Sequence, residues 1–416
     1  MAAHSRQPMR APAPPLPESD SLPLSGVRVL DVTQVMAGPF CGMLLGDMGA
    51  DVIKVEPPDG GDQTRSAMGF KLKGDDSLGF INLNRNKRSV AINLKSEAGR
   101  QAFYALVKTA DILVENYRPG AVARLGIDYE TLSALNPGLI YASISGFGQT
   151  GPWSQRPGFD LIAQAMGGIM SITGYPDQPP AKAGVPVADL GCALLALYGI
   201  LSAYILRQRT GRGQHIDASL FEAAIAFAIW DISEYWGTGR IPTPLGTAHR
   251  MSAPYQAMRA KDDYFVVGAN NDRLWKLLCE SLGRGDLVDD PRFATISDRL
   301  ANREALVAEL ERSFAARNAQ EWVDELLAKG IPAGPIYNYE QALGSDHAAY
   351  RETVMTIDHP VEGRVRSIGF PIKFSETKQT VRRHPPLLGE HTGEVLSELG
   401  FDEETVARMR SAGAVA

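Results

Sequence analysis

The sequence has little cysteine and no excess of positive charge. Only 3 of its 416 residues are cysteines, and its formal net charge is −6. Cys41, Cys192 and Cys279 lie far apart and match no zinc spacing, so we expect three buried thiols in a reducing, cytoplasmic protein. The acidic balance argues against nucleic acid as a partner, and no basic block indicates a membrane surface.

The sequence also lacks the common motifs of phosphate loops, zinc peptidases and serine hydrolases. It contains no G-x-x-x-x-G-K-[ST], H-E-x-x-H or G-x-S-x-G pattern. The 7 histidines are scattered. We interpret His215 and His249 as structural residues, because a metal site needs clustered donors. We therefore expect neither a metal nor a tightly bound cofactor.

One glycine motif matches by spelling but lacks the required context. Gly146–Gly151 reads G-x-G-x-x-G and follows a predicted strand. A dinucleotide site needs the last glycine at the start of a helix, whereas Pro152, Trp153 and then Pro157 follow here. We interpret the segment as an ordered loop that lets the backbone approach a bulky ligand, and not as a nicotinamide site.

Most of the chain alternates between predicted strands and helices. With 44% hydrophobic and 22% charged residues, it suits a globular protein with a large core. The expected strands are Val27–Asp31, Asp51–Glu56, Ser89–Leu94, Asp111–Asn116, Leu139–Ser145 and His215–Ser219, with helices between them. This order predicts an α/β fold with a doubly wound, Rossmann-like sheet and right-handed crossovers.

The expected domain boundaries follow changes in composition. Residues 1–22 hold five of the 27 prolines and no apolar run, which indicates a disordered tail rather than a secretory signal. The other expected parts are a large domain over 23–236, a linker over 237–254, a smaller α+β domain over 255–340 and a return segment over 341–416 that completes the large domain. Leu220–Trp236 and Arg299–Ala316 read as single helices, and Asp262–Val267 resembles an edge strand.

Asp189 directly precedes the uncharged run Leu190–Leu206, which predicts a long apolar helix. At 17 residues the run is at the short limit for a bilayer, and we interpret it as a buried core helix. An anion at a helix N-terminus is stabilised by unpaired N–H groups and by the helix dipole, so the carboxylate stays ionised where water is scarce. Asp189 therefore suits a helix N-cap or a carboxylate nucleophile, and the two roles are compatible.

The turn after the first predicted strand is a candidate ligand contact. Thr33–Pro39 has one glycine and no acidic residue. Ligands of doubly wound sheets bind at the carboxyl ends of the strands. The apolar character of this turn suits a thioether arm or an adenine better than a pyrophosphate, although a plain tight turn would have the same sequence.

Eight short segments occur along the chain in a specific order. They are L-D-V-T-Q-V-M-A-G-P (Leu30–Pro39), G-A-D-V-I-K-V-E-P-P (Gly49–Pro58), N-R-N-K-R-S (Asn84–Ser89), V-E-N-Y-R-P-G (Val114–Gly120), G-F-G-Q-T-G-P (Gly146–Pro152), T-G-R-G-Q-H-I-D (Thr210–Asp217), G-I-P-A-G-P (Gly330–Pro335) and P-P-L-L-G-E-H-T (Pro385–Thr392). Together they resemble the class III coenzyme A transferases, which include formyl-CoA and carnitine-CoA transferases. The resemblance covers the chain from about Leu24 to Leu399.

The resemblance implies that CoA moves from an acyl-CoA donor, such as succinyl-CoA, to a small carboxylic or dicarboxylic acid. It assigns Asp189 the role of nucleophile, which forms a mixed anhydride and then an aspartyl-CoA thioester. Asp160 is a candidate supporting group. The implied CoA contacts are Val35, Ala37, Ile92, Lys95, Asn116, Tyr117 and Arg124. Lys95 and Arg124 also read as solvated surface charges, and Tyr117 also reads as a core residue.

The resemblance further implies a homodimer of two interlocked subunits, and three departures from its pattern concern specificity. Met36 stands where formyl-CoA transferase has a glutamine, which argues against formyl or oxalate specificity. Pro57 stands where that enzyme has an arginine that contacts phosphate. The segment around Gly268 has fewer glycines than the family's lid.

Two other functions stay open from the sequence. The same fold hosts α-methylacyl-CoA racemases, which need a histidine directly before the aspartate at position 160. Phe159 stands there and cannot exchange a proton, so racemisation by such a pair is disfavoured. The other alternative is a non-catalytic protein that binds acyl-CoA in the same cleft.

Overall fold

The computed structural model describes residues 22–67 and 69–416. The predicted tail therefore falls, apart from Leu22, outside the described residues. The described chain divides into two compact units: the first comprises 22–158, 189–220 and 353–416, and the second comprises 159–188 and 221–352. This division differs from the expected boundaries, because the segments 159–188 and 221–236 group with the second unit rather than with the large sheet.

The first unit is built around a parallel sheet. Its strands are β1 (Arg28–Asp31), β2 (Asp51–Glu56), β3 (Lys87–Ala91), β4 (Ile112–Glu115), β5 (Ile140–Ser145) and β6 (His215–Ser219). They pair in the order β3-β2-β1-β4-β5-β6, and every one of these pairings is parallel. The predicted doubly wound sheet is confirmed, and its strand order reverses between β1 and β4.

Helices cover both faces of this sheet. They are α1 (Ala37–Asp47), α2 (Leu78–Leu83), α3 (Glu97–Val107), α4 (Ala121–Leu125), α5 (Tyr129–Leu135), α8 (Val187–Thr210), α17 (Thr392–Glu398) and α18 (Glu403–Ser411). Ile53 of β2 belongs to the core that includes Phe103 of α3 and Leu396 of α17. The next residue towards the N-terminus, Val52, packs on the other face against Gly46 of α1. Successive strand residues point to opposite faces, so burial on both sides explains why these strands read as nearly continuous apolar runs.

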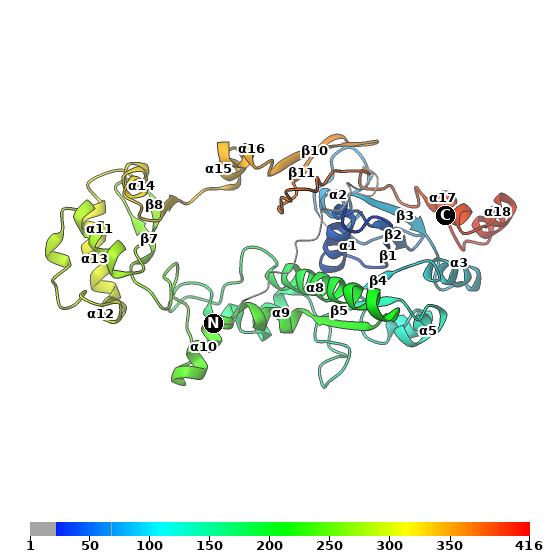
Figure 1. Ribbon diagram of the computed structural model, residues 1–416, viewed down its shortest axis with the longest axis horizontal. Coiled ribbons are helices and arrows are strands. Elements are labelled where there is room, and N and C mark those ends of the chain that lie inside the picture. Colours follow the sequence, from blue (N-terminus) through cyan, green and yellow to red (C-terminus); the bar gives the residue numbers. More distant parts are fainter. Residues whose placement is uncertain (1–21, 68) are drawn as a thin grey trace, which may run out of the picture. The chain divides into compact units, whose positions relative to one another are not determined.

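The C-terminal segment returns to the first strands of the sheet. β10 (Val354–His359) and β11 (Gly363–Ile368) form an antiparallel hairpin. The N–H of His391 then donates to the Ser89 carbonyl at 2.9 Å, and Val415 forms a bridge with Ile92. Figure 1 shows the resulting arrangement, in which α17 and the C-terminus lie beside β3. The edge strand β3 is thereby covered, which keeps its side of the sheet from pairing with another chain.

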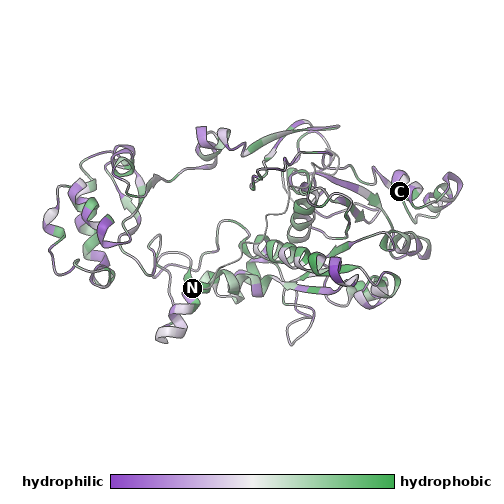
Figure 2. Ribbon diagram, in the orientation of Figure 1, coloured by the Kyte–Doolittle hydropathy of each residue, from purple (hydrophilic) through white to green (hydrophobic). Residues whose placement is uncertain are grey.

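Helix α8 packs with its small residues inward and its large residues outward. Cys192, Ala196 and Ala203 are buried, whereas Leu195 is 40% exposed and Tyr198 is 72% exposed. The helix is largely green in Figure 2, on the outward side as well. Within the described residues it is the single helix long and apolar enough to span a membrane, and 33% of its most apolar window is buried. The prediction of a buried core helix is therefore wrong for the isolated chain.

The second unit combines short helices with a small antiparallel sheet. Its elements are α6 (Asp160–Met166), α7 (Ile169–Ile172), α9 (Leu220–Phe227), α10 (Ile229–Thr238), β7 (Tyr255–Arg259), β8 (Tyr264–Gly268), α11 (Asp272–Ser281), the 3₁₀ turn η2 (Gly285–Leu287), α12 (Ile296–Ala301), α13 (Arg303–Phe314), α14 (Ala319–Ala328), β9 (Ala333–Pro335), α15 (Tyr339–Leu343) and α16 (Asp346–Tyr350). Trp275, Phe265 and Phe314 belong to its core.

Three predictions for local structure in this unit are wrong. The predicted edge strand is β8, which lies in the middle of the order β7-β8-β9 because β7 was not recognised. The helix predicted over 299–316 is interrupted at Asn302, whose Nδ2 donates to the Asp298 carbonyl at 3.0 Å. A side chain that bonds to nearby backbone competes with helix continuation. The helix predicted over 220–236 is likewise divided at Ala228.

The cysteines are free and buried, as predicted. Cys41 lies in α1 with no exposed surface. Burial raises its pKa to about 12, so the thiol stays protonated and unreactive at neutral pH.

Close packing of α1 against the sheet depends on glycine. Beneath α1, the fully buried Asp31 and Lys87 form an ion pair in which Nζ lies 2.7 Å from Oδ2. A Cβ at Gly42 would lie 2.7 Å from Asp31 Oδ2 and 3.3 Å from Lys87 Nζ. A Cβ at Gly38 would lie 2.3 Å from the Thr33 side chain. Any larger residue would push the helix away from the ion pair.

The substitution Gly42→Ala tests this packing. We expect it to lower the free energy of unfolding by about 2 kcal/mol, because the new methyl group collides with a carboxylate that cannot leave its buried partner. Urea unfolding followed by circular dichroism measures the change. Gly393→Ala in α17 is the control: its Cβ would meet only the end of Arg410 at 3.6 Å, and its stability should be unchanged or slightly higher. Equal stability of both variants would contradict the packing argument.

Candidate functional site

The carboxyl ends of β1 and β4 meet where the strand order reverses. Asn116 directly follows β4, and its Oδ1 accepts from the Gln34 N–H at 2.9 Å while its Nδ2 donates to the Gln34 carbonyl at 2.7 Å. Gln34 lies in the turn after β1. In open α/β sheets, ligands bind in the crevice at such a switch point. The structure therefore brings the predicted residues Val35, Ala37, Asn116 and Tyr117 to the edge where a ligand site is expected.

The first turn leads directly into α1. Val35 has a φ of 69°, and Ala37 is the first residue of the helix. The N-cap residue Met36 makes no side-chain capping bond, and the first turn of α1 contains no acidic residue. The N–H groups of a helix start carry partial positive charge. This end of α1 therefore favours an electron-rich ligand group.

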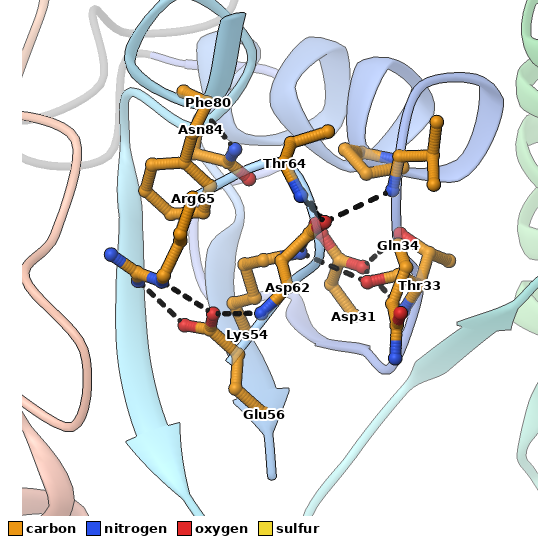
Figure 3. Close-up of polar contacts among 12 residues, drawn as sticks. Asp31, Thr33, Gln34, Lys54, Glu56, Asp62, Thr64, Arg65, Phe80 and Asn84 are labelled. Atoms are coloured by element: carbon orange, nitrogen blue, oxygen red, sulfur yellow. Dashed lines mark hydrogen bonds and ion pairs between the residues drawn. The ribbon is translucent and has the colours of Figure 1, made fainter. Parts of the chain in front are cut away.

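Buried charges lie beneath the first turn. Lys54 Nζ donates to the Thr33 carbonyl at 2.9 Å and lies 2.9 Å from Asp62 Oδ2. Lys54, Asp62 and Thr64 point toward one another in Figure 3. Burial alone would raise the pKa of Asp62, but the charge of Lys54 and the hydrogen bonds outweigh it and hold the pKa below its ordinary value. The pair is therefore ionised at neutral pH.

A second buried pair adjoins the first. Arg65 holds Glu56 with two bonds of 2.7 and 2.8 Å, and Ser89 donates to the same carboxylate at 2.7 Å. Burial raises the pKa of Glu56, but Arg65 outweighs this and the net shift is downward. The sequence interpretation assigned no role to Lys54, Glu56, Asp62 or Arg65. The available signal was the presence of lysine and glutamate inside the otherwise apolar strand β2, since buried charges require partners.

The remaining predicted CoA contacts follow β3 and β4. Ile92 is 1% exposed and belongs to the core beneath the sheet. Lys95 is exposed after β3, and Arg124 is exposed in the last turn of α4. Tyr117 is half-buried against the core, and its N–H donates to Glu115 Oε2 at 2.8 Å. These residues share the carboxyl edge of the sheet with the first turn, although the Ile92 side chain points into the core.

Asp189 is the third residue of α8 and not its N-cap, so the capping interpretation is wrong. Its side chain is half-buried. At the other end of the helix, Arg207 NH2 lies 2.7 Å from Asp111 Oδ1, at the amino edge of β4. Between these ends, Gly199 packs against Ile216 at the start of β6. At a rise of about 1.5 Å per residue, ten residues carry the helix about 15 Å from there toward the carboxyl edge, where Asp189 lies.

The cap of α8 is supplied by Asp160. Its Oδ1 accepts from the N–H of Ala188 at 2.9 Å, one residue before Asp189. Its Oδ2 accepts from Gln164 Nε2 at 2.6 Å, and Gln164 Oε1 in turn accepts from the Ala183 N–H at 2.9 Å. Gln164 is fully buried, and the sequence interpretation missed it. This network fixes the segment that leads into α8.

Two other interpretations of the sequence concern glycine and histidine. The segment Gly146–Gly151 is a loop, as predicted, and α6 begins only at Asp160. His215 Nε2 lies 2.9 Å from Ser143 Oγ, and its ring stacks on Tyr129 at 5.2 Å. These contacts are those of a structural histidine. Within the described residues, no group of three or more histidine, cysteine or acidic side chains could hold a metal.

The sequence profile described as CoA-transferase family III matches residues 24–392. The chain belongs to CoA-transferase family III. Its resemblance to class III coenzyme A transferases is thereby confirmed, and the protein is a transferase that acts on CoA thioesters. The sheet edge described above is accordingly the candidate CoA site of this family III transferase.

Curated relatives of this family III transferase match over most of their length. The chain is 39% identical to the succinyl-CoA:glutarate CoA-transferase of Mus musculus, over 96% of this chain and 92% of that protein. It is 41% identical to the succinyl-CoA:mesaconate CoA-transferase of Haloarcula marismortui, over 92% of this chain and 98% of that protein. It is 42% identical to the acetyl-CoA:oxalate CoA-transferase of Acetobacter aceti, over 85% and 89% respectively.

Solved structures share the fold. A CAIB/BAIF family protein from Brucella suis is 39% identical, with a TM-score of 0.80 over 91% of this chain and all of that one. A protein from Mycobacterium tuberculosis is 32% identical, with a TM-score of 0.81 over 90% of this chain and 99% of that one.

Glu115 gives this transferase a pH-dependent term in its stability. The residue ends β4, is 1% exposed, and burial raises its pKa from 4.5 to about 7. Below pH 4.5 the carboxyl group is protonated in both the folded and the unfolded chain. Between pH 4.5 and 7 only the unfolded chain releases the proton, so the stability falls as pH rises, and above pH 7 the loss is complete.

The substitution Glu115→Gln should remove this term, because the amide stays neutral and its oxygen can still accept from Tyr117. We expect the variant to gain about 3 kcal/mol over the wild type at pH 8 relative to their difference at pH 4.5. Urea unfolding of both proteins at the two pH values measures it. A difference between variant and wild type that is the same at both pH values would contradict the assignment.

Proposed function

We propose that this transferase moves CoA from an acyl-CoA donor, such as succinyl-CoA, to a small dicarboxylic acid. Support comes from relatives named for transfer to glutarate and mesaconate, at 39% and 41% identity. Exchange of this kind needs no redox step, because one thioester and one carboxylate are converted into another such pair. The observation that carries the mechanism is Asp189 in the first turn of α8, at the carboxyl edge of the sheet.

We propose Asp189 as the nucleophile in a four-step exchange. Its carboxylate attacks the thioester carbonyl of the donor, the C–S bond breaks, and CoA leaves as a thiolate. The thiolate then attacks the aspartyl carbonyl of the mixed anhydride, which releases the donor acid and leaves an aspartyl-CoA thioester. The acceptor carboxylate attacks this thioester and expels the thiolate again. Finally, the thiolate attacks the acyl carbonyl of the acceptor, which forms the new acyl-CoA and restores Asp189.

The helix start supports each of these steps. Asp189 lies among the first N–H groups of α8, which favour the free carboxylate and the oxyanions that form at its carbon. Asp160 holds the Ala188 N–H, so we propose that it positions the nucleophile and takes no part in bond making. On the other side of the exchange, the first turn with Val35 and Ala37, together with Asn116, Tyr117, Lys95, Arg124 and Ile92, would bind CoA.

The substitution Asp189→Ala tests the nucleophile. We expect transfer from succinyl-CoA to glutarate, mesaconate or oxalate to fall below detection, while CoA still binds. The assay is mass-spectrometric detection of the new acyl-CoA, with calorimetry for CoA binding. Peptide mapping of wild-type enzyme trapped with hydroxylamine during turnover should place the modification on Asp189.

Asp128→Ala is the matched control, because Asp128 caps α5 by accepting from the Thr131 N–H at 2.9 Å. We expect it to lose about 1 kcal/mol of stability and to keep its exchange activity. Exchange by Asp189→Ala at the wild-type rate would refute the nucleophile. Absence of exchange in the wild type, with CoA binding intact, would favour the non-catalytic alternative.

We further propose that the enzyme is a homodimer of interlocked subunits. Support comes from the outward face of α8, on which Leu194, Tyr198 and Ile205 are 48%, 72% and 64% exposed. A soluble monomer rarely exposes so many large apolar side chains on one helix. A second copy of the chain would remove them from water and would make a membrane span unnecessary.

The double substitution Leu195→Asp with Tyr198→Asp tests the interface. Light scattering after gel filtration should give the mass of two chains for the wild type and of one chain for the variant, because two charges cannot be buried there without partners. Ala134→Asp on the exposed side of α5 should leave the dimer intact. A monomeric wild type, or one that needs detergent to stay in solution, would contradict the proposal.

A further inference from the structure

The backbone of the first turn is held at consecutive residues by side chains from other parts of the sheet. Lys54 of β2 binds the Thr33 carbonyl, and Asn116 after β4 binds both backbone groups of Gln34. Hydrogen bonds to backbone groups fix the path of the chain rather than the side chains that project from it. The turn is therefore held from both of the strands that flank β1.

Val35 is the next residue, and its conformation is strained. Its φ of 69° lies in the left-handed region, where the Cβ of a branched residue crowds the backbone. The Val35 N–H donates to Asp62 Oδ1 at 3.2 Å. A conformation of this kind persists only where the surrounding structure holds it, and it is found preferentially at functional sites.

Asp62 is itself fixed so that it can hold the turn. Its Oδ1 also accepts from the N–H and the hydroxyl of Thr64, at 2.9 and 2.8 Å, and its Oδ2 lies 2.9 Å from Lys54 Nζ. The side chains of Lys54 and Asp62 are both 0% exposed. Because neither can reach a ligand, any effect that they have on ligand binding must act through the turn.

The choice of valine indicates what the strain is for. Glycine adopts a positive φ without cost, so glycine at position 35 would form the same turn more easily. The chain instead carries a branched apolar side chain at the switch point, directly before the uncapped start of α1. A valine held in this way presents both its side chain and the backbone of residues 35–37 to the crevice in one fixed shape.

We propose that Asp62, supported by Lys54, is a positioning residue for CoA binding that acts by holding Val35 in its left-handed conformation. The inference rests on the proposed function, because it requires that the first turn contacts CoA. Preorganisation of this kind lowers the cost of binding and leaves the chemistry at Asp189 untouched. Loss of Asp62 should therefore weaken the binding of CoA and spare the rate of transfer.

Two substitutions at Asp62 grade the effect. Asp62→Asn keeps an oxygen for the Val35 N–H but loses the ion pair, and Asp62→Ala loses both. We expect Kd for CoA and KM for succinyl-CoA to rise about tenfold in Asp62→Ala and less in Asp62→Asn, since the left-handed conformation is then no longer held. We expect kcat and KM for the acceptor acid to stay within about twofold of the wild type.

The same substitutions in a Val35→Gly background separate positioning from general stability. Glycine needs no help to adopt a positive φ, so in this background the change at Asp62 should raise Kd for CoA by less than about threefold. A merely structural role for Asp62 would give the same loss of affinity in both backgrounds. Should Asp62→Ala fail to fold, Asp62→Asn with and without Val35→Gly carries the same comparison.

Asp47→Asn is the matched control. Asp47 is 1% exposed, like Asp62, and pairs with Arg85 at 2.6 Å at the far end of α1. It should lower Tm without changing Kd for CoA. Equal changes of Kd in Asp62→Asn and Asp47→Asn, or no smaller effect in the glycine background, would overturn the inference. A wild type that neither binds CoA nor transfers it would instead refute the proposed function on which the inference rests.

Discussion

Buried ion pairs beneath the first turn are the constraint on which the site depends. Asp31 with Lys87 and Lys54 with Asp62 all lie out of contact with water, between β1, β2, β3 and the loop that follows β2. Charges in such a place are tolerated only when they are paired and further hydrogen-bonded. They are bonded here to the backbone of the turn and of α1, through the carbonyls of Thr33 and Pro39. The charges therefore fix the shape of the sheet edge at which CoA transfer is proposed.

This arrangement explains several features of the surrounding chain. Lys87 occupies the edge strand β3, and burial lowers its pKa to about 8 although Asp31 stabilises its charged form. Gly42 leaves room for this pair under α1. The C-terminal segment then covers β3 through the contact of His391 with Ser89. Each of these features keeps water away from the charges, which strengthens their attraction.

Asp189 is presented by a different physical device. The charged pairs act from within the sheet, whereas α8 carries its aspartate along the length of a helix anchored at the other end by Arg207 and Asp111. The small residues on its inner face allow the helix to lie close to the sheet, as Gly199 does against Ile216. Asp160 fixes the start of the helix through the Ala188 N–H. Position and protonation of the proposed nucleophile are thus controlled by backbone geometry.

The predictable part of the site was the part encoded by local sequence. The strands, the turn over Thr33–Pro39 and an aspartate at the start of a long helix follow from alternation, turn residues and an uncharged run. The roles of Asn116 and Asp160 were only partly predictable. Asn116 was expected to bind CoA, and its amide binds Gln34. Asp160 was expected to support catalysis, and it caps α8. A sequence shows which polar groups exist but not which backbone atoms they meet.

By itself, the sequence determined the parallel α/β sheet, the placement of ligand-binding turns at strand ends and the membership of the family. These properties depend on short patterns of apolar, glycine and charged residues along the chain. Only the tertiary structure decided that β8 is a central strand, that α8 turns its large side chains outward, and that Lys54 and Asp62 support Val35. The reason is that burial and pairing depend on residues brought together from distant segments, and their attraction has no signature at any one position of the chain.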